Sequence, residues 1–259
     1  MNRSLQTMLK RSCAVALALS LAVPAVLGQA DDSQAKAKAM LTFDVAKRFF
    51  RDGMFATAVE RFDAFAGMHP GSAHHAEAVL LEGQARFQLG QFEGVAEELA
   101  AGLQAAGPWT DRYLFWIGEV QFALGHFNLA AASYGQLIEK YPASVRALTA
   151  ALGKAQSLYQ LGELKQSIAT LEPADGPFQR AASARPSDPL IVDGRLLLAN
   201  AYFELKELGA ARLLLENLPD AGLSPERFWE KHHLLASVYL GEASLDRALG
   251  GATNLVQLA

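Results

Sequence analysis

Residues 115–142, FWIGEVQFALGHFNLAAASYGQLIEKYP, decide the fold, because they have the composition of a helix and yet contain Gly118 and Gly125. A glycine inside a helix costs about 1 kcal/mol relative to alanine. Glycine is favoured, however, where the chain turns with a positive φ. We therefore place Gly125 in a short turn between two helices. We expect Gly118 to lie in the first helix where the second crosses it, with Ala130 facing the glycine so that the backbones approach closely.

The same pattern recurs along the chain. Aligning the sequence on six turn positions gives spacings of 37, 35, 37, 44 and 37 residues. The six turn positions are Gly53, Gly90, Gly125, Gly162, Lys206 and Ala243. With few exceptions, small residues recur seven positions before and five after each turn, and large apolar residues recur three before, two after and nine after. A period of this length is typical of repeated helical hairpins.

Prolines mark the ends of the helical segments. Every proline after residue 30 lies at a boundary between segments rich in Ala, Leu, Glu and Gln, and strand signals are nearly absent. The sequence therefore predicts an all-α protein with a repeat domain over residues 37–259. Its six hairpins are expected at about residues 37–70, 73–107, 111–142, 145–172, 190–219 and 225–259. Residues 173–189 are rich in proline and are expected to form an irregular insertion with at most a short helical turn.

The first 30 residues have the pattern of a secretory signal peptide. Three basic residues precede an apolar run over residues 13–27, and Gly28-Gln29-Ala30 supplies the small residues of a cleavage site. The alternative is a membrane anchor, but the run is shorter than the roughly 20 residues that a span needs, and Pro24 interrupts it. We expect a protein that is exported to the periplasm or secreted, with a short linker over residues 31–36 and no membrane span after cleavage.

Charge and cysteine content limit the possible partners. Without residues 1–30 the chain keeps 20 basic and 27 acidic side chains, a net charge of −7. This negative charge disfavours nucleic acid and anionic lipid headgroups. The one cysteine, Cys13, lies in the predicted signal peptide, so no thiol remains for catalysis, disulfides or zinc. We interpret His69, His74 and His75 as a solvated loop rather than a metal site. No catalytic motif was found, so neither an enzyme activity nor a cofactor is expected.

The repeat pattern resembles that of the tetratricopeptide repeat family over about residues 37–259. The family positions filled in the third hairpin are Gly118, Gly125, Phe127, Ala130, Tyr134 and Pro142. Residues 58–92 are similar to bacterial cell-envelope members such as the outer-membrane-protein assembly lipoprotein and the Tol–Pal-associated coordinator protein. The chain departs from the family at Lys206 and Ala243, which replace the turn glycine. The resemblance implies a right-handed superhelical solenoid in which the first helices of the hairpins line a concave groove.

Two sets of residues are expected to face that groove. The aromatic row, three positions before the turns, is Phe50, Phe87, Phe122, Tyr159 and Phe203. The polar row, six positions before the turns, is Lys47, Gln84, Glu119, Gln156 and Asn200. Apolar anchors beside hydrogen-bonding side chains suit an extended peptide or an amphipathic helix. The alternative is that the aromatic side chains fill the space between neighbouring hairpins.

These features favour an exported, non-catalytic scaffold that binds a protein or peptide partner in the cell envelope. The alternative is a helical accessory or adaptor domain of a larger protein or complex. That alternative arises because Leu255, Val256 and Leu258 are apolar in the last hairpin, where a repeat array needs a polar cap. The identity of the partner does not follow from the repeats, whose specificity depends on the individual groove.

Overall fold

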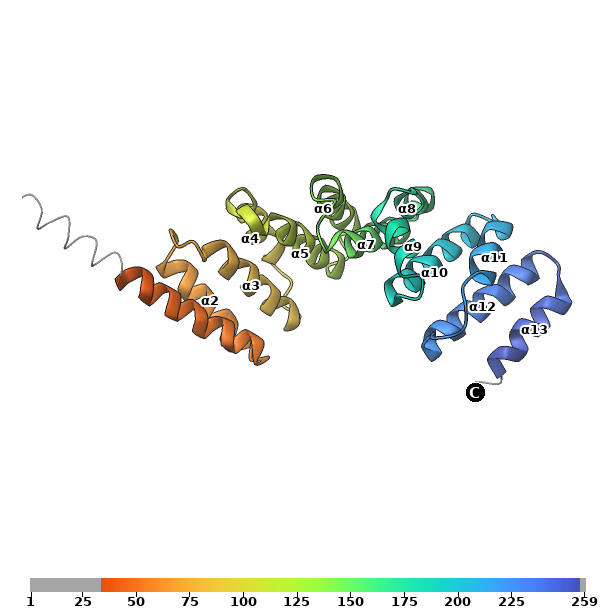
Figure 1. Cartoon of the computed structure of the whole chain (residues 1–259), viewed down its shortest axis with the longest axis horizontal. Helices are drawn as coiled ribbons and strands as arrows, with labels where there is room; N and C mark the ends of the chain where they lie inside the picture. Colours follow the sequence, from red (N-terminus) through yellow and green to blue (C-terminus); the bar gives the residue numbers. More distant parts are fainter. Residues whose placement is uncertain (1–33, 257–259) are drawn as a thin grey trace, which may run out of the picture. The chain divides into compact units, whose positions relative to one another are not determined.

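The computed structural model describes the backbone of residues 34–256 and the side chains of residues 34–250. The predicted signal peptide and the side chains of Leu255, Val256 and Leu258 therefore lie outside the described residues. The chain divides between Leu89 and Gly90 into two compact units. Both units consist of helices joined by turns, and residues 34–256 contain no strand (Figure 1). The all-α prediction is confirmed.

The first unit contains a helix over residues 34–51, α2 (Phe55–Met68) and α3 (His75–Gln88). Residues 34–36 are helical, which corrects the prediction of a linker there; alanine and lysine are favourable helix residues. The buried Phe43 ring lies 5.3 Å from that of Phe65 and stacks at 4.7 Å on His74. His74 therefore packs against the helix over residues 34–51 while its side chain stays 39% exposed, so the loop that was interpreted as solvated is solvated only in part.

The second unit contains ten α-helices among the described residues. In chain order they are α4 (Val95–Gly102), α5 (Thr110–Ala123), α6 (Phe127–Lys140), α7 (Ala147–Gln160), α8 (Leu164–Leu171), α9 (Pro177–Ala184), α10 (Pro189–Glu204), α11 (Leu208–Glu216), α12 (Pro225–Gly241) and α13 (Leu245–Val256). Two short 3-10 helices, Leu103–Ala105 and Gly107–Trp109, precede α5. Successive helices pack as pairs, α5 with α6, α7 with α8, α10 with α11 and α12 with α13 (Figure 1).

All six predicted turn positions have a positive φ. The angles are 74° at Gly53, 71° at Gly90, 75° at Gly125, 74° at Gly162, 64° at Lys206 and 57° at Ala243. An L-residue in this region costs roughly 1–2 kcal/mol, so the left-handed turn is kept even where a side chain makes it unfavourable. The register of the repeats that the sequence predicted is confirmed at each of these turns.

The turn geometry gives a prediction for stability. We expect Gly125→Ala to lower the free energy of unfolding by about 1 kcal/mol, because alanine is strained at a positive φ. No atom lies within 4 Å of the added Cβ, so backbone strain is the whole effect. Ala243→Gly, which relieves strain at an equivalent turn, should raise the free energy of unfolding by about 0.5 kcal/mol. Urea denaturation measures both changes.

Gly209 provides the matched control. It lies in α11 without a positive φ, and it too has no atom within 4 Å of an added Cβ. Gly209→Ala should therefore leave the stability unchanged or raise it by up to about 1 kcal/mol through helix propensity. Equal losses of stability in Gly125→Ala and Gly209→Ala would show that the positive φ at Gly125 is not the cause of its effect.

Gly118 makes room for an aromatic ring rather than for a second small residue. A Cβ at Gly118 would lie 2.6 Å from Tyr134 Cε1, and one at Gly153 would lie 2.7 Å from Tyr134 Cε2. The three atoms nearest to the Gly118 position all belong to Tyr134, which corrects the expectation that Ala130 faces this glycine. The buried ring of Tyr134, from α6, thus fits between a glycine of α5 and a glycine of α7.

The segment 173–189 contains a helix, α9, where an irregular insertion with at most a short helical turn was expected. Pro177 occupies its first turn, where the missing N–H is tolerated. Phe178 and Ala182, one helical turn apart, are buried in the core shared with α7, α8 and α10. The insertion is therefore an integral part of the second unit.

Candidate functional site

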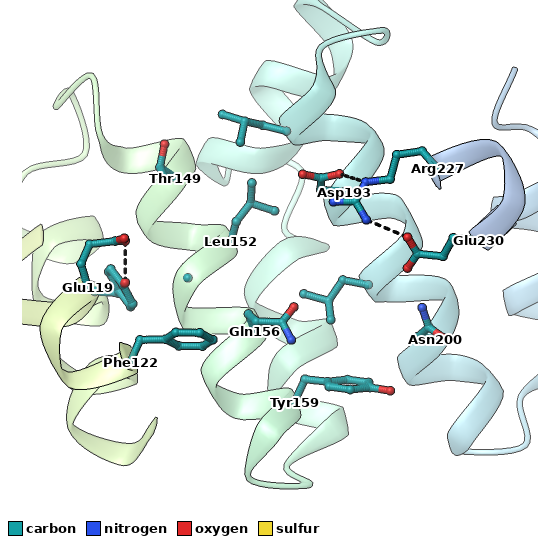
Figure 2. A pocket seen from close by; sticks show the side chains of 14 residues that line it. Glu119, Phe122, Thr149, Leu152, Gln156, Tyr159, Asp193, Asn200, Arg227 and Glu230 are labelled. Carbon is teal, nitrogen blue, oxygen red and sulfur yellow. Dashed lines mark hydrogen bonds and ion pairs between the residues drawn. The ribbon is translucent and has the colours of Figure 1, made fainter. Parts of the chain in front are cut away.

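A groove of about 500 Å³ lies in the second unit (Figure 2). Its walls come mainly from α5, α7, α10 and α12. Glu119 and Phe122 lie toward one end, Arg227 toward the other, and Leu152 and Gln156 between them (Figure 2). The groove therefore offers both apolar and polar side chains along its length.

Half of the predicted site residues lie together in this groove. They are Glu119, Phe122, Gln156, Tyr159 and Asn200, from both the aromatic and the polar row. Successive first helices of the hairpins, α5, α7 and α10, present them. The structure thus brings the middle of each predicted row to one place.

Phe203 does not line the groove. Its ring packs against the core of α10, α11 and α12, and the Lys206 amino group lies 5.4 Å from its centroid. Phe203 therefore fills space between hairpins, which was the alternative considered for the aromatic row. The structure corrects its assignment to the groove.

The remaining four predicted residues belong to the first unit and are not part of this groove. The Phe50 ring packs edge-on against Phe55, 5.6 Å between centroids, as part of the local core. The Lys47 amino group lies 2.8 Å from Glu77 Oε1, so that lysine joins its helix to α3. Gln84 and Phe87 are half-buried on α3.

The two aromatic residues of the groove also contribute to packing. The half-buried ring of Phe122 lies 5.2 Å from that of Phe127, edge-on. Tyr159 packs against the core around α9 and donates a hydrogen bond from its hydroxyl to Glu204. Burial and the contact with Glu204 raise the pKa of Tyr159 to about 12, so the phenol stays protonated near neutral pH. Substituting either ring will therefore affect stability as well as the groove.

Glu119 is held at its end of the groove by Tyr134. The tyrosine hydroxyl donates to Glu119 Oε1 at 2.7 Å, and the ring is fixed between Gly118 and Gly153. Burial raises the pKa of Glu119, while the hydrogen bond from Tyr134 and the charge of Arg146 oppose that rise. Burial and the adjacent carboxylate in turn raise the pKa of Tyr134.

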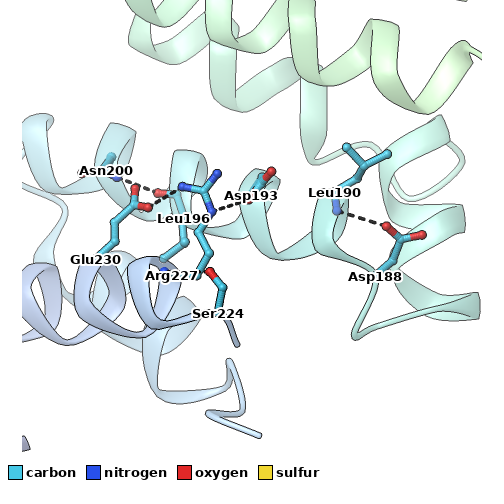
Figure 3. A network of polar contacts seen from close by, with 8 residues as sticks. All are labelled: Asp188, Leu190, Asp193, Leu196, Asn200, Ser224, Arg227 and Glu230. Carbon is cyan, nitrogen blue, oxygen red and sulfur yellow. Dashed lines mark hydrogen bonds and ion pairs between the residues drawn. The ribbon is translucent and has the colours of Figure 1, made fainter. Parts of the chain in front are cut away.

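A charged network closes the other end of the groove. Arg227 Nε lies 2.7 Å from Asp193 Oδ1, and Arg227 Nη1 lies 2.7 Å from Glu230 Oε2 (Figure 3). Burial would lower the pKa of Arg227, but the bonds to Glu230 and Asp193 raise it overall, so the guanidinium remains charged. Asn200 donates from Nδ2 to the Leu196 carbonyl at 3.0 Å, which leaves its side-chain oxygen available as an acceptor.

Helix caps position this network. Asp188 accepts a hydrogen bond from the Leu190 N–H at 3.0 Å and begins α10, the helix that carries Asp193. Ser224 accepts from the Arg227 N–H at 3.3 Å and begins α12. Because a capped first turn is less prone to fray, the charged side chains near both helix starts are held in place.

The groove also contains residues that were not predicted as site residues. Those with charged or phenolic side chains are Tyr134, Asp193, Arg227 and Glu230. Three of them lie in the early turns of α10 and α12, outside the offsets that the repeat alignment covers, and Tyr134 reaches the groove from a second helix. In the sequence, Tyr134 holds the recurring large position nine residues after the turn at Gly125, which was not among the positions expected to face the groove.

Within the part of the chain that the structure describes, no group of three or more His, Cys, Asp or Glu side chains is placed to hold a metal ion. None of the helices in this part combines the length and the apolar character that crossing a bilayer requires.

Comparison with known proteins identifies the repeat type. The chain matches the tetratricopeptide repeat family over residues 43–108 and 112–144. Its structure is similar to that of a tetratricopeptide repeat protein from Parabacteroides merdae, with a TM-score of 0.63, 13% identity, and coverage of 85% of this chain and 80% of the other. It is also similar to pilF of Pseudomonas aeruginosa, with a TM-score of 0.60, 14% identity, and coverage of 86% and 93%.

A third similar structure is BtubC (BKLC) from P. vanneervenii, with a TM-score of 0.61, 13% identity, and coverage of 82% of this chain and 90% of the other. At such identities the similarity shows the fold alone. No curated protein sequence matches this chain.

Proposed function

Because this chain is a tetratricopeptide repeat protein, we propose that it is an exported, non-catalytic scaffold that binds a protein or peptide partner in the bacterial cell envelope. Repeats of this kind present extended surfaces on which a partner chain can lie. The export part of the proposal is supported by the basic and apolar pattern of residues 1–30 and the small residues at 28–30.

The observation that carries the binding proposal is the composition of the groove. Apolar side chains such as Leu152 and Leu197 alternate there with the amides of Gln156 and Asn200. Within the described residues, the Gln156 side chain makes no hydrogen bond and the Asn200 side-chain oxygen accepts none. A peptide backbone, which needs both donors and acceptors when it leaves water, can pair with such amides.

The groove can be tested with a variant that changes few packing contacts. We expect Gln156→Ala/Asn200→Ala to weaken partner binding roughly tenfold or more, the effect of losing two hydrogen-bonding groups. Its thermal midpoint should change little, because neither amide joins two helices. The partner is first captured from an envelope extract with residues 31–259, and the dissociation constant is then measured with purified components.

Gln166→Ala is the matched control, since Gln166 is an exposed glutamine on α8 away from the groove. It should bind the partner as the unmodified protein does. Equal binding by the unmodified protein, the double variant and the Gln166→Ala control would contradict binding of the partner in the groove. Fractionation tests export, because the protein should appear in the periplasm or the medium without residues 1–30.

A further inference from the structure

The charges that line the groove indicate the chemistry of its occupant. Three carboxylates, those of Glu119, Asp193 and Glu230, line it, and Arg227 is the one basic residue among the lining residues. The groove therefore has an excess of negative charge, in agreement with the net negative charge of the chain. A ligand of opposite charge is favoured in a concave site, where the surrounding protein focuses the field.

The single basic residue is not available to an anionic ligand. Both Asp193 and Glu230 lie 2.7 Å from the Arg227 guanidinium, which is thus already paired. A carboxylate ligand, such as the C-terminus of a partner, would have to displace one of these partners and would face repulsion from the remaining carboxylates. An anionic occupant is therefore disfavoured.

Glu119 offers the opposite arrangement. Its Oε1 accepts from Tyr134, while Oε2 makes no hydrogen bond within residues 34–250. The side chain is half-buried and lines the groove together with Phe122 and Leu152, so its charge has lost part of its hydration. The charged group of a lysine or arginine placed against Oε2 would replace that hydration, and the aliphatic part of the same side chain would lie along the apolar wall of the groove.

We propose that the groove binds a segment of a partner protein in which a lysine or arginine lies next to a large apolar residue. The basic group pairs with Glu119, and the apolar residue packs between Leu152 and Leu197. This inference rests on the proposed function and adds the class of partner. The groove volume of about 500 Å³ accommodates side chains of a few residues.

Three synthetic peptides test the charge preference. Their sequence is Gly-Ser-Gly-Phe-X-Leu-Gly-Ser-Gly, with lysine, glutamine or glutamate at X and both ends blocked. Binding to residues 31–259 is measured by isothermal titration at low ionic strength. We expect the lysine peptide to bind roughly tenfold more tightly than the glutamate peptide, with the glutamine peptide between them, the effect of about one partly buried ion pair.

The double variant Glu119→Gln/Glu230→Gln should reduce this preference to about threefold or less, since the amides keep the shape of the carboxylates but not their charge. Glu97→Gln/Glu139→Gln removes two exposed carboxylates outside the groove and should keep the full preference. Peptides that bind equally, or best with glutamate, would overturn the charge preference while leaving peptide binding intact. Binding of none of the three would overturn the groove function itself. A preference that the control variant also loses would show that general surface charge, not the groove, is responsible.

Discussion

Gly194→Ala is expected to lower the free energy of unfolding by about 3 kcal/mol, at the upper end of the usual cost of overpacking a core. A Cβ at this position of α10 would overlap the ring of Phe178 and would lie 2.8 Å from Leu152 Cδ2. Phe178 is only 1% exposed, and it is enclosed by α7, α8 and α10, so the ring has no free space into which it can move. Chemical denaturation of the second unit measures the loss.

The same substitution should also disturb the groove. Leu152 contacts the Gly194 position and lines the groove, so displacing it changes the wall against which a partner would pack. Gly209→Ala, with no neighbouring atom within 4 Å, is the control for the general effect of alanine. If Gly194→Ala and Gly209→Ala have the same stability, the docking of α9 does not depend on this glycine.

A double-mutant cycle tests whether the Phe178 ring causes the loss of stability in Gly194→Ala. Phe178→Leu shortens the side chain, so adding it to Gly194→Ala should recover about 1–2 kcal/mol of the loss. If the effects of the two substitutions on the free energy of unfolding simply add, the loss in Gly194→Ala comes from Leu152 or from the helix itself. The Gly194–Phe178 contact would then not be what attaches the insertion 173–189 to the unit.

The sequence predicted the helices and turns well because these depend on local chemistry. A positive φ is required at the turn inside each hairpin, and glycine is the residue that adopts it most readily, so glycines mark the repeat period. Lys206 and Ala243 keep the left-handed turn without glycine, and their place in the period was nevertheless sufficient to identify them. The large residues that recur nine positions after the first five turns are all buried, namely Phe62, Leu99, Tyr134, Leu171 and Leu215.

The same reasoning failed for α9. Its eight residues are too few to show a clear helical period, and the prolines and glycines around it have the composition of a loop. Phe178 and Ala182, spaced one turn apart after Pro177, were the available signal. Burial against α7 and α10, a tertiary effect, stabilises this short helix, and local composition does not report it.

The candidate site was predicted only in part, because tertiary contacts also place some of its residues. Residues at fixed offsets from the turns, such as Phe122 and Gln156, are placed by the repeat and could be aligned. Asp193 and Arg227 lie near the starts of their helices, where no offset recurs from hairpin to hairpin, and their pairing depends on how α10 meets α12. Phe203 has the right offset, yet it packs against the core of its own hairpins, because an offset does not determine which neighbour a side chain meets.

Tyr134→Ala is expected to lower the free energy of unfolding by about 4 kcal/mol, the usual cost of removing a large buried aromatic ring. The ring is 1% exposed and contacts α5 at Gly118 and α7 at Gly153, so its loss leaves a cavity between two hairpins. It also removes the hydrogen bond that holds Glu119 at the groove. Tyr134→Phe keeps the ring and removes only that bond, and should cost about 1–2 kcal/mol.

A substitution at Gly118 distinguishes the observed packing of this glycine against Tyr134 from a contact between two small residues, Gly118 and Ala130. In the unmodified protein, Gly118→Ala places a Cβ 2.6 Å from the Tyr134 ring and should cost about 2–3 kcal/mol. In the Tyr134→Ala background that ring is gone, so the same substitution should become neutral or stabilise by up to about 1 kcal/mol through helix propensity. Urea denaturation of the unmodified protein, the two single variants and the double variant measures the effect of Gly118→Ala on the free energy of unfolding in each background. A change in the sign of this effect is specific to the Tyr134 ring. A cost that persists in the Tyr134→Ala background would instead point to a close backbone approach near Ala130, since that contact does not involve Tyr134.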